Sequence, residues 1–256
     1  MDIVCSFQGE VGFVSIERPE RRNALSLSLW RQLRVTLGDC AADPAVRCVI
    51  LSGAGGHFCA GADISEFSRL RTSLDDALEY DRELGQCLDL AMRMSKPIIA
   101  AIEGNCFGGG VALACACDFR VAGRGARFAI PAARLGTLYP RVAMQALQSV
   151  VSAATCRRML MLGGALTSSD ALAAGLVDYV DDAPMLYARE IAGQLCRAAP
   201  LSLAGAKLGL CRRNQPGILD LDERLDRLAA QAFQSRDYAE GIDAFLNKRS
   251  PNFVGA

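Results

Sequence analysis

Short apolar runs rich in β-branched residues recur along this chain, and they constrain its fold more than any other feature. Such runs predict strands that are buried on both faces of a sheet. We expect them over residues 46–53 (VRCVILSG), 96–104 (KPIIAAIEG), 118–123 (DFRVAG) and 176–182 (LVDYVDD). Helical patterns are expected at 27–41, before the first run and with Ser26 as N-cap, and at 73–94, between the first two runs. Strands that alternate with helices predict an α/β fold with a parallel or mixed sheet.

The two ends of the chain differ from its middle. Two short strands are expected near residues 3–7 and 10–17, joined by a tight turn. After residue 184 the chain has a helical pattern almost throughout, with breaks at Ala199–Pro200 and at Asn214–Gly217. We place a boundary near residue 195. It divides an α/β core, residues 1–195, from a helical C-terminal region, residues 196–256.

Charge and composition narrow the class of protein. Acidic and basic residues number 28 each, and 51% of the 256 residues are apolar. A balanced charge argues against nucleic acid or a membrane surface as the main partner. No apolar run approaches the length that spans a bilayer, and the N-terminus lacks a basic segment followed by an apolar core. We therefore expect a globular, cytoplasmic protein.

The cysteines and the single histidine predict no metal site. Eleven cysteines are scattered from Cys5 to Cys211, and none of them forms a CxxC pair. Because His57 is the one histidine, a zinc site is not expected. Most of the cysteines are expected to act as small buried apolar residues in a reducing compartment.

The chain lacks the common sequence motifs for nucleotide binding and for a serine nucleophile. GAGGHF (53–58) follows a predicted strand, but Phe58 occupies the last glycine position of GxGxxG. The acid about 20 residues further on, Asp75, falls inside a predicted helix. The chain contains neither GxxxxGK[ST] nor GxSxG, and His57 lies in a glycine-rich turn that suits a catalytic base poorly.

Two other glycine-containing turns carry the stronger signal. FCAGADI (58–64) and FGGGVAL (107–113) each follow a predicted strand, and the second opens a helix. N–H groups at a helix start have no partner within the helix, and the helix dipole is positive there. Two such groups aimed at one point form an oxyanion hole. The alternative is ordinary turn chemistry with close strand–helix packing.

These turns belong to a longer series of segments that resembles the enoyl-CoA hydratase/isomerase superfamily, which has the crotonase fold. The matching segments are ERPERRNALS (17–26), FCAGADI, KPIIAAIEGNCFGGG (96–110), FAIPAARLG (128–136), ALAAGLVD (171–178) and DYAEGIDAFLNKRSPNF (237–253). The resemblance implies a spiral core of repeated ββα units and a C-terminal helical oligomerisation region. It also implies a homotrimer or a dimer of trimers.

The same resemblance implies a thioester site. In that superfamily two backbone N–H groups bind the thioester oxygen of acyl-CoA, and the matching groups here belong to Ala62 and Gly109. Coenzyme A enters as part of the substrate, so no separate cofactor is expected. Substrate contacts are implied for Arg22, Ala24, Leu25, Ala60, Asp63, Ile64 and Gly108.

This chain departs from the hydratases of the superfamily at both of their glutamates, which are replaced by Ala112 and Ala132. Hydration needs one group that takes a proton from water and one that delivers a proton to carbon, and alanine does neither. Tyr139 ends the loop LGTLY. Tyrosine at this position occurs in the methylmalonyl-CoA decarboxylase branch, which implies a catalytic role in binding the departing carboxylate or directing protonation. The alternative is an aromatic side chain that packs over the loop.

Three functions therefore stay open. The leading one is an acyl-CoA enzyme that holds a thioester enolate at Ala62 and Gly109. The second is a malonyl-type acyl-CoA decarboxylase, because loss of carbon dioxide creates the enolate without a base. The third is a non-catalytic acyl-CoA-binding protein. Substitutes for the missing glutamates are to be sought among Glu103, Asp63 and Glu66, or in an external anion such as bicarbonate beside Ala132.

Overall fold

The main sheet of the protein is mixed and carries the predicted buried strands. The computed structural model describes residues 2–66, 73–211 and 220–255. Within them, six strands pair in the order β1 (Ile3–Gln8), β2 (Val11–Ile16), β3 (Cys48–Gly53), β4 (Ile98–Ile102), β6 (Phe119–Gly123) and β9 (Tyr179–Asp181). β1 and β2 form an antiparallel hairpin, and every later pair is parallel. The α/β fold, the N-terminal hairpin and a strand in each of the four predicted runs are thus confirmed. The fourth strand, β9, was wrongly expected to be buried, because it lies at the edge of the sheet and none of its three residues is buried.

A second, smaller sheet was not predicted from the sequence. It consists of β5 (Asn105–Phe107), β7 (Arg127–Ala129) and β8 (Leu166–Thr167). β5 pairs in parallel with β7, and β7 pairs antiparallel with β8. Strands of two or three residues are too short to show an alternating pattern, so no sequence signal marked them. This sheet matters because β5 leads directly into the glycine triplet.

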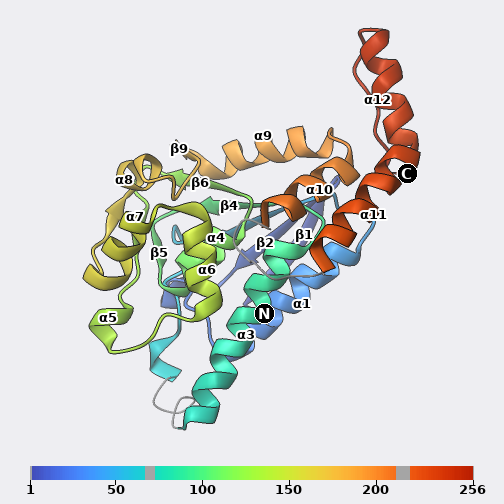
Figure 1. Cartoon of the computed structure of the whole chain (residues 1–256). Coiled ribbons are helices and arrows are strands. Elements are labelled where there is room, and N and C mark those ends of the chain that lie inside the picture. Colours follow the sequence, from blue (N-terminus) through green and yellow to red (C-terminus); the bar gives the residue numbers. More distant parts are fainter. Residues whose placement is uncertain (1, 67–72, 212–219, 256) are drawn as a thin grey trace.

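Helices cover both faces of the main sheet, because side chains alternate in direction along each strand. Ile50, Ile99 and Val121 pack against α9 (Pro184–Cys196) on one face. Val49, Leu51, Ile98 and Ala100 face the larger core on the other side. That core also contains residues of α1 (Leu27–Ala42), α3 (Leu74–Arg93), α4 (Gly109–Ala116) and α6 (Arg141–Val150). Figure 1 shows α9 across one face and α1 and α3 across the opposite face.

The two predicted helices begin where their caps are. The Ser26 hydroxyl accepts a hydrogen bond from Leu29 N at the start of α1. Ser73 and Asp76 form a reciprocal capping box at the start of α3. The shorter helical segments are η1 (Pro19–Arg21), η2 (Ile64–Glu66), α5 (Ala132–Leu135), α7 (Ala153–Arg157), η3 (Arg158–Leu162) and α8 (Ser168–Ala173).

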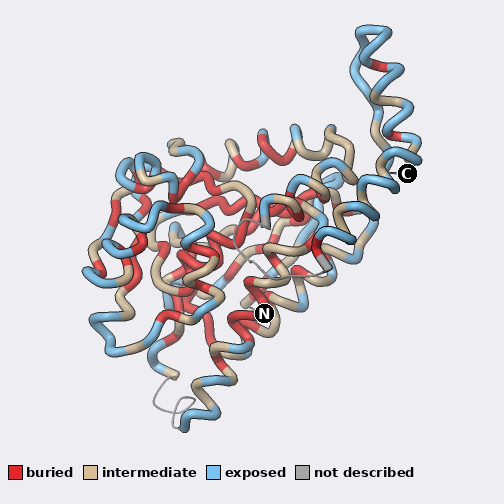
Figure 2. Tube along the Cα trace, viewed as in Figure 1, coloured by how far each residue is buried: buried red, intermediate tan, exposed pale blue. Residues whose placement is uncertain are grey.

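The C-terminal region is helical, as predicted. It contains α10 (Pro200–Cys211), α11 (Asp220–Gln234) and α12 (Arg236–Leu246). The break at Ala199–Pro200 is confirmed, since α9 ends at Cys196 and α10 begins at Pro200, whereas Asn214–Gly217 lie outside the described residues. α12 extends away from the rest of the chain, and most of it is exposed (Figures 1 and 2).

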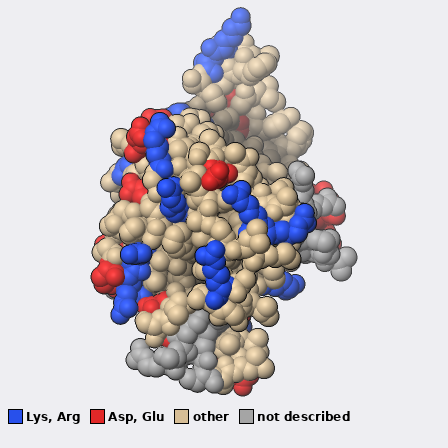
Figure 3. Space-filling view, turned by 90° about the vertical axis from the view of Figure 1, so that its left-hand side faces the viewer, with Lys and Arg blue, Asp and Glu red and all other residues tan. Residues whose placement is uncertain are grey.

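Charged side chains are dispersed over the face of the molecule that Figure 3 shows. Figure 3 looks onto the face formed by α5, α7 and α8, where basic side chains stand apart with uncharged surface between them. In the described part of the chain, no helix combines the length and the apolar character that crossing a bilayer would require.

Candidate active site

The two glycine turns of the sequence lie against each other. Phe107 N donates to Cys59 O at 2.9 Å, and Cys59 N donates to Asn105 O at 3.0 Å, so the two segments form a parallel bridge. Gly61 makes this approach possible. Its φ is +92°, and a Cβ there would lie 2.7 Å from Phe107 O. FCAGADI and FGGGVAL, which are separate in the sequence, thus lie side by side in the folded chain.

The glycine triplet is required by close contacts and by an unusual backbone. Gly108 has φ 49° and ψ −114°, a combination that residues with a Cβ avoid. A Cβ on Gly110 would lie 2.4 Å from Cys59 O, and one on Gly109 would lie 3.0 Å from Trp30 Cζ2. The triplet therefore lets the start of α4 approach the neighbouring turn and the Trp30 ring.

Two backbone N–H groups point away from these contacts. Leu25 N donates to Gly61 O at 2.7 Å and Asp63 N donates to Leu25 O at 3.0 Å, so the N–H of Ala62, between them, faces the opposite side. Gly109 is the first residue of α4, where N–H groups lack a partner in the helix. Within residues 2–66, 73–211 and 220–255, neither N–H donates to a protein acceptor.

Ala62 and Gly109 line the same pocket, whose volume is about 120 Å³. Its walls come from the two turns, from α3, and from α5 with the loop that follows it. Most of the lining is apolar, and the polar side chains are those of Tyr80, Asp81, Thr137 and Tyr139. Predicted members of the wall are Ala60, Ala62, Ile64, Gly108, Gly109, Ala132 and Tyr139.

Tyr139 supports the glycine turn. Its hydroxyl donates to Gly108 O at 3.0 Å, and Ala112 N donates to the same oxygen at 3.2 Å. Because the C=O and N–H of a peptide group point in opposite directions, holding Gly108 O on one side directs Gly109 N–H to the other. Burial of the phenol, near the Cys115 and Cys106 thiols, raises the pKa of Tyr139 well above its ordinary value. The hydroxyl thus keeps its proton, which is already engaged.

Tyr139→Phe is expected to lower the free energy of unfolding by about 0.5–1.5 kcal/mol, because the hydrogen bond to Gly108 O is lost from a buried site. Urea unfolding measures this change. Tyr179→Phe is the control, since Tyr179 is partly exposed and lies outside the pocket. Equal stability of Tyr139→Phe and wild-type protein would show that this hydrogen bond does not hold the turn.

The predicted substrate turns run side by side. Ala60 N donates to Arg22 O at 2.9 Å, which joins the 22–25 segment to the 60–63 segment. Arg22 is exposed and has φ 49°, whereas Leu25 is buried. Asn23, also with positive φ, is buried, and its amide donates to Ala54 O at 2.8 Å and to His57 O at 2.6 Å. The side chain of Asn23 therefore ties the first turn to the 54–57 loop.

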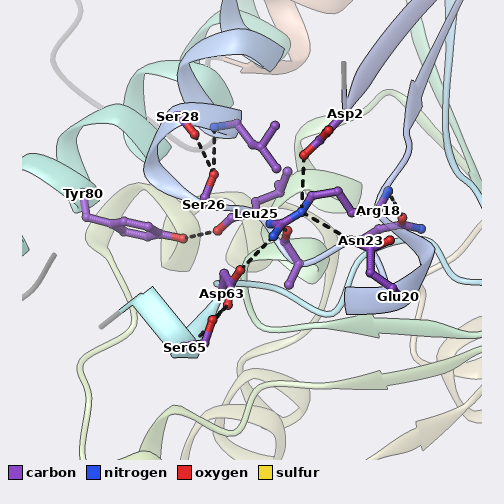
Figure 4. Close-up of polar contacts among 12 residues, drawn as sticks. Asp2, Arg18, Glu20, Asn23, Leu25, Ser26, Ser28, Asp63, Ser65 and Tyr80 are labelled. Atoms are coloured by element: carbon purple, nitrogen blue, oxygen red, sulfur yellow. Dashed lines mark hydrogen bonds and ion pairs between the residues drawn. The ribbon is translucent and has the colours of Figure 1, made fainter. Parts of the chain in front are cut away.

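Arg18 and Asp63 form an ion pair beneath these turns (Figure 4). Arg18 Nη2 lies 3.2 Å from Asp63 Oδ2, and Nη1 donates to Ala24 O at 2.9 Å. Burial alone would raise the pKa of Asp63, but hydrogen bonds from Ser65 and Arg18 outweigh it and lower that pKa. The carboxylate of Asp63 is a structural anion that holds the backbone of both turns.

The other acidic residues and the histidine that the sequence offered for proton transfer do not line the pocket. Glu103 is exposed and lies outside the pocket lining, as does Glu66. Asp118 precedes β6, and its Oδ2 accepts from Ile98 N and from Lys207 Nζ, each at 2.7 Å. His57 Nδ1 accepts from Asn105 N at 3.1 Å. The side chains of Asp118 and His57 thus hold backbone groups of the core.

Ala112 and Ala132, the two positions where the resemblance implies glutamates in hydratases, differ in their surroundings. Ala132 begins α5 and lines the pocket, with part of its surface exposed. Ala112 is fully buried inside α4, one turn after Gly108 and next to the Tyr139 hydroxyl. Only the Ala132 position opens directly onto the pocket.

Several functional residues escaped the sequence reasoning. Arg18 and Asn23 lie in the quoted ERPERRNALS segment, but nothing local shows which side chains turn inward. Asp81 falls in a helical pattern rich in charges, where a solvent-facing side chain is the ordinary expectation. Tyr80 OH donates to Leu25 O at 2.9 Å and accepts from Trp30 Nε1 at 2.8 Å, a link that only the folded chain creates.

Comparisons with known proteins all identify the same family. A family model for enoyl-CoA hydratase/isomerase matches residues 6–256. The chain is 33% identical over 262 residues to the 2,3-dehydroadipyl-CoA hydratase of Escherichia coli strain K12, with 99% of each chain covered. It is 32% identical over 266 residues to the (E)-benzylidenesuccinyl-CoA hydratase of Thauera aromatica, with 100% of each covered.

Solved structures agree with this result. An enoyl-CoA hydratase/isomerase family protein from Hyphomonas neptunium has a TM-score of 0.92 and 34% identity, covering 99% of this chain and 97% of that one. An enoyl-CoA hydratase/carnithine racemase from Magnetospirillum magneticum also gives 0.92, with 33% identity over 100% of this chain and 96% of that one.

Proposed function

Since the chain belongs to the enoyl-CoA hydratase/isomerase family, we propose that this enzyme binds an acyl-CoA thioester between the two glycine turns and stabilises its enolate. The likeness to solved structures confirms the predicted crotonase fold. One observation carries the proposal: the N–H groups of Ala62 and Gly109 line one pocket with no acceptor among the described residues. Negative charge that develops on a thioester oxygen there would receive two hydrogen bonds.

We further propose that the coenzyme A part of the substrate lies along the 22–25 and 60–64 segments. Ala60, Ile64 and Gly108 line the pocket, which places its entrance beside these segments. Arg22 is exposed next to them, and an arginine there suits the phosphate groups of coenzyme A. Ala24, Leu25 and Asp63 support the path from below, through Arg18 and the Leu25–Ala62 bridge. Coenzyme A belongs to the substrate, and no separate cofactor is invoked.

The position of Tyr139 bears on the choice of reaction. Its proton is engaged with Gly108 O, and the loss of this proton is opposed by burial. We therefore propose that Tyr139 positions the Gly109 N–H, in place of the acid–base or carboxylate-binding role of a decarboxylase. Ala112 and Ala132 leave hydration without its two usual acid–base groups, so hydration would need a proton-transfer group from elsewhere, either another residue or an external anion.

Binding and turnover together test this function. Calorimetry with acetyl-CoA and crotonyl-CoA should detect binding below millimolar ligand, and coenzyme A without an acyl group should bind less tightly. A panel of enoyl and malonyl-type thioesters should include at least one that is turned over. Failure of every CoA thioester to bind contradicts the proposal. Binding without any turnover identifies a non-catalytic acyl-CoA-binding protein.

We also propose that residues 196–256 assemble the core, residues 1–195, into a trimer or a dimer of trimers. Phe245 is 84% exposed and lines one groove with Tyr238, Ile242 and Leu246. Large apolar side chains are exposed throughout this C-terminal region. They are Phe233, Tyr238, Ile242, Leu246 and Val254. Contiguous apolar surface of this kind is typical of contacts between copies of a chain.

Light scattering at micromolar concentration is expected to give the mass of three or six chains. Phe245→Glu combined with Leu246→Glu should shift the mass toward one chain, because charges would be placed in the apolar contact. A monomeric mass for wild-type protein would contradict the assembly.

The cytoplasm is the compartment that we propose for this activity. The ten cysteines with described side chains are free thiols, and most are buried. Free buried thiols suit a reducing compartment.

A further inference from the structure

Two cysteine side chains that are far apart in the sequence meet beside the first strand of the main sheet. Cys5 lies on β1 and Cys40 lies on α1, and their Sγ atoms are 3.7 Å apart. Two sulfur atoms at this distance are in van der Waals contact. Among the ten cysteines whose side chains are described, no other two thiols form a hydrogen bond with each other.

The surrounding backbone holds both sulfur atoms in place. Cys5 pairs with Val14 of β2, and its side chain packs against the large core, on the side of the sheet where α1 lies. Lys96 Nζ donates to Cys40 O at 2.8 Å, which fixes the last turn of α1. A Cβ on Gly12 would lie 3.4 Å from Cys40 Sγ, so this sulfur packs directly against β2. The contact between the two thiols is therefore set by the fold.

The two thiols differ in their access to solvent. Cys5 is half-buried, and its strand has a neighbour on one side only within the described residues. Cys40 is fully buried, and burial together with the nearby Cys5 raises the pKa of Cys40 to about 12. Cys40 thus keeps its proton at neutral pH, whereas a small solute can reach Cys5. An oxidant from solvent meets Cys5 first, with Cys40 directly behind it.

We propose that Cys5 and Cys40 form a dithiol site that reacts with hydroperoxides and closes to a disulfide. Cys5 is the thiol that the hydroperoxide oxidises, and Cys40 is the thiol that then forms the bond. Neither residue lines the active-site pocket, and the inference does not depend on the proposed function. In a reducing compartment the resting form of the site is the pair of free thiols.

The reaction with a hydroperoxide has two steps. The Cys5 thiolate attacks one oxygen, the O–O bond breaks, and the departing oxygen takes up a proton and leaves as water or an alcohol. Cys5 then carries a sulfenic acid. The Cys40 sulfur attacks the Cys5 sulfur, the S–O bond breaks, and the departing hydroxide takes the Cys40 proton and leaves as water. The two thiols have lost two electrons, which have reduced the hydroperoxide.

A small movement separates the thiol contact from the bond. A disulfide has a sulfur–sulfur distance of about 2.05 Å, so the two atoms must approach by roughly 1.7 Å. Rotation about the Cα–Cβ bond of Cys5 moves its sulfur by such a distance. The bond encloses residues 5–40 in one loop, which restricts the unfolded chain and so stabilises the folded one. It also ties β1, the first strand of the sheet, to α1.

The experiment treats the full-length, reduced protein with hydrogen peroxide and then blocks the remaining thiols under denaturing conditions. The number of free thiols should fall from eleven to nine, because one disulfide uses two of them. Mass spectrometry of the digested, unreduced protein should find the Cys5 and Cys40 peptides joined. Dithiothreitol should separate these peptides again.

Three variants assign the two roles. Cys5→Ser should form no disulfide, and its Cys40 should stay reduced because it is buried. Cys40→Ser should stop at the sulfenic acid of Cys5, which dimedone traps as a stable adduct. Cys196→Ser is the matched control, since Cys196 is also half-buried but lies on α9, against the opposite face of the sheet. It should form the Cys5–Cys40 bond as wild-type protein does.

Thermal unfolding measures what the bond does to the fold. Oxidised wild-type protein should have a Tm higher than that of the reduced protein by roughly 5–10 °C, and dithiothreitol should reverse the rise. Cys5→Ser should show no rise after the same treatment.

Three results would overturn the inference. They are eleven free thiols after treatment of wild-type protein, a disulfide that joins other cysteines, and a Tm of the oxidised protein at or below that of the reduced protein. Formation of the bond in Cys196→Ser together with its loss in Cys5→Ser supports the assignment.

Discussion

Gly109→Val is expected to lower kcat of the thioester reaction by about 10²–10³-fold, the usual effect of losing one oxyanion donor. A Cβ on residue 109 would lie 3.0 Å from Trp30 Cζ2. Trp30 is fully buried and bound to the Tyr80 hydroxyl, so the ring cannot easily move away. The start of α4 must shift instead, and this carries the N–H of residue 109 away from the substrate oxygen.

The measurement is steady-state turnover of whichever thioester the wild-type enzyme uses best. Gly125→Val is the matched control, because Gly125 lies in an exposed turn where an added Cβ would have no atom within 4 Å. Circular dichroism and urea unfolding show whether the variant is folded. If folded Gly109→Val turned over substrate within tenfold of wild type, the oxyanion role of Gly109 would be wrong.

Wild-type protein is expected to hydrate crotonyl-CoA far more slowly than ordinary enzymes, whose kcat is roughly 10 s⁻¹. Each positioned acid–base group contributes about 10²–10⁴ in rate, and alanine stands at both positions where the resemblance implies a glutamate. Ala132→Glu should raise hydration, because residue 132 opens onto the pocket. Ala112→Glu added to it should help less, because Ala112 is fully buried beside Tyr139 and has no space for a carboxylate.

The restored activity should depend on pH. Desolvation in an apolar pocket raises the pKa of an introduced carboxyl group, so the base form appears only as pH rises through that raised pKa. The gain from Ala132→Glu should therefore increase with pH. Ala132→Gln is the control, since it adds the same bulk without the carboxylate. Wild-type hydration at roughly 10 s⁻¹ or more would mean that a carboxylate already present activates water.

Some strands and helices of this fold could be predicted from the sequence, and others could not. Buried strands and capped helices depend on residues that are close together in the chain. The runs at 46–53 and 96–104 therefore predicted β3 and β4, and Ser26 marked the start of α1. The strand Asn105–Phe107 gave no such signal, because three residues show no period.

By itself, the sequence determined the α/β fold and the two glycine turns, because each is a matter of residue type and local spacing. Only the tertiary structure decided which groups face the pocket. Asp63 and Asp81 are both carboxylates, yet one is bound to Arg18 beneath the turns and the other lines the pocket. These placements depend on contacts between residues far apart in the chain, such as Arg18 with Asp63 and Tyr80 with Leu25, which a local pattern cannot contain.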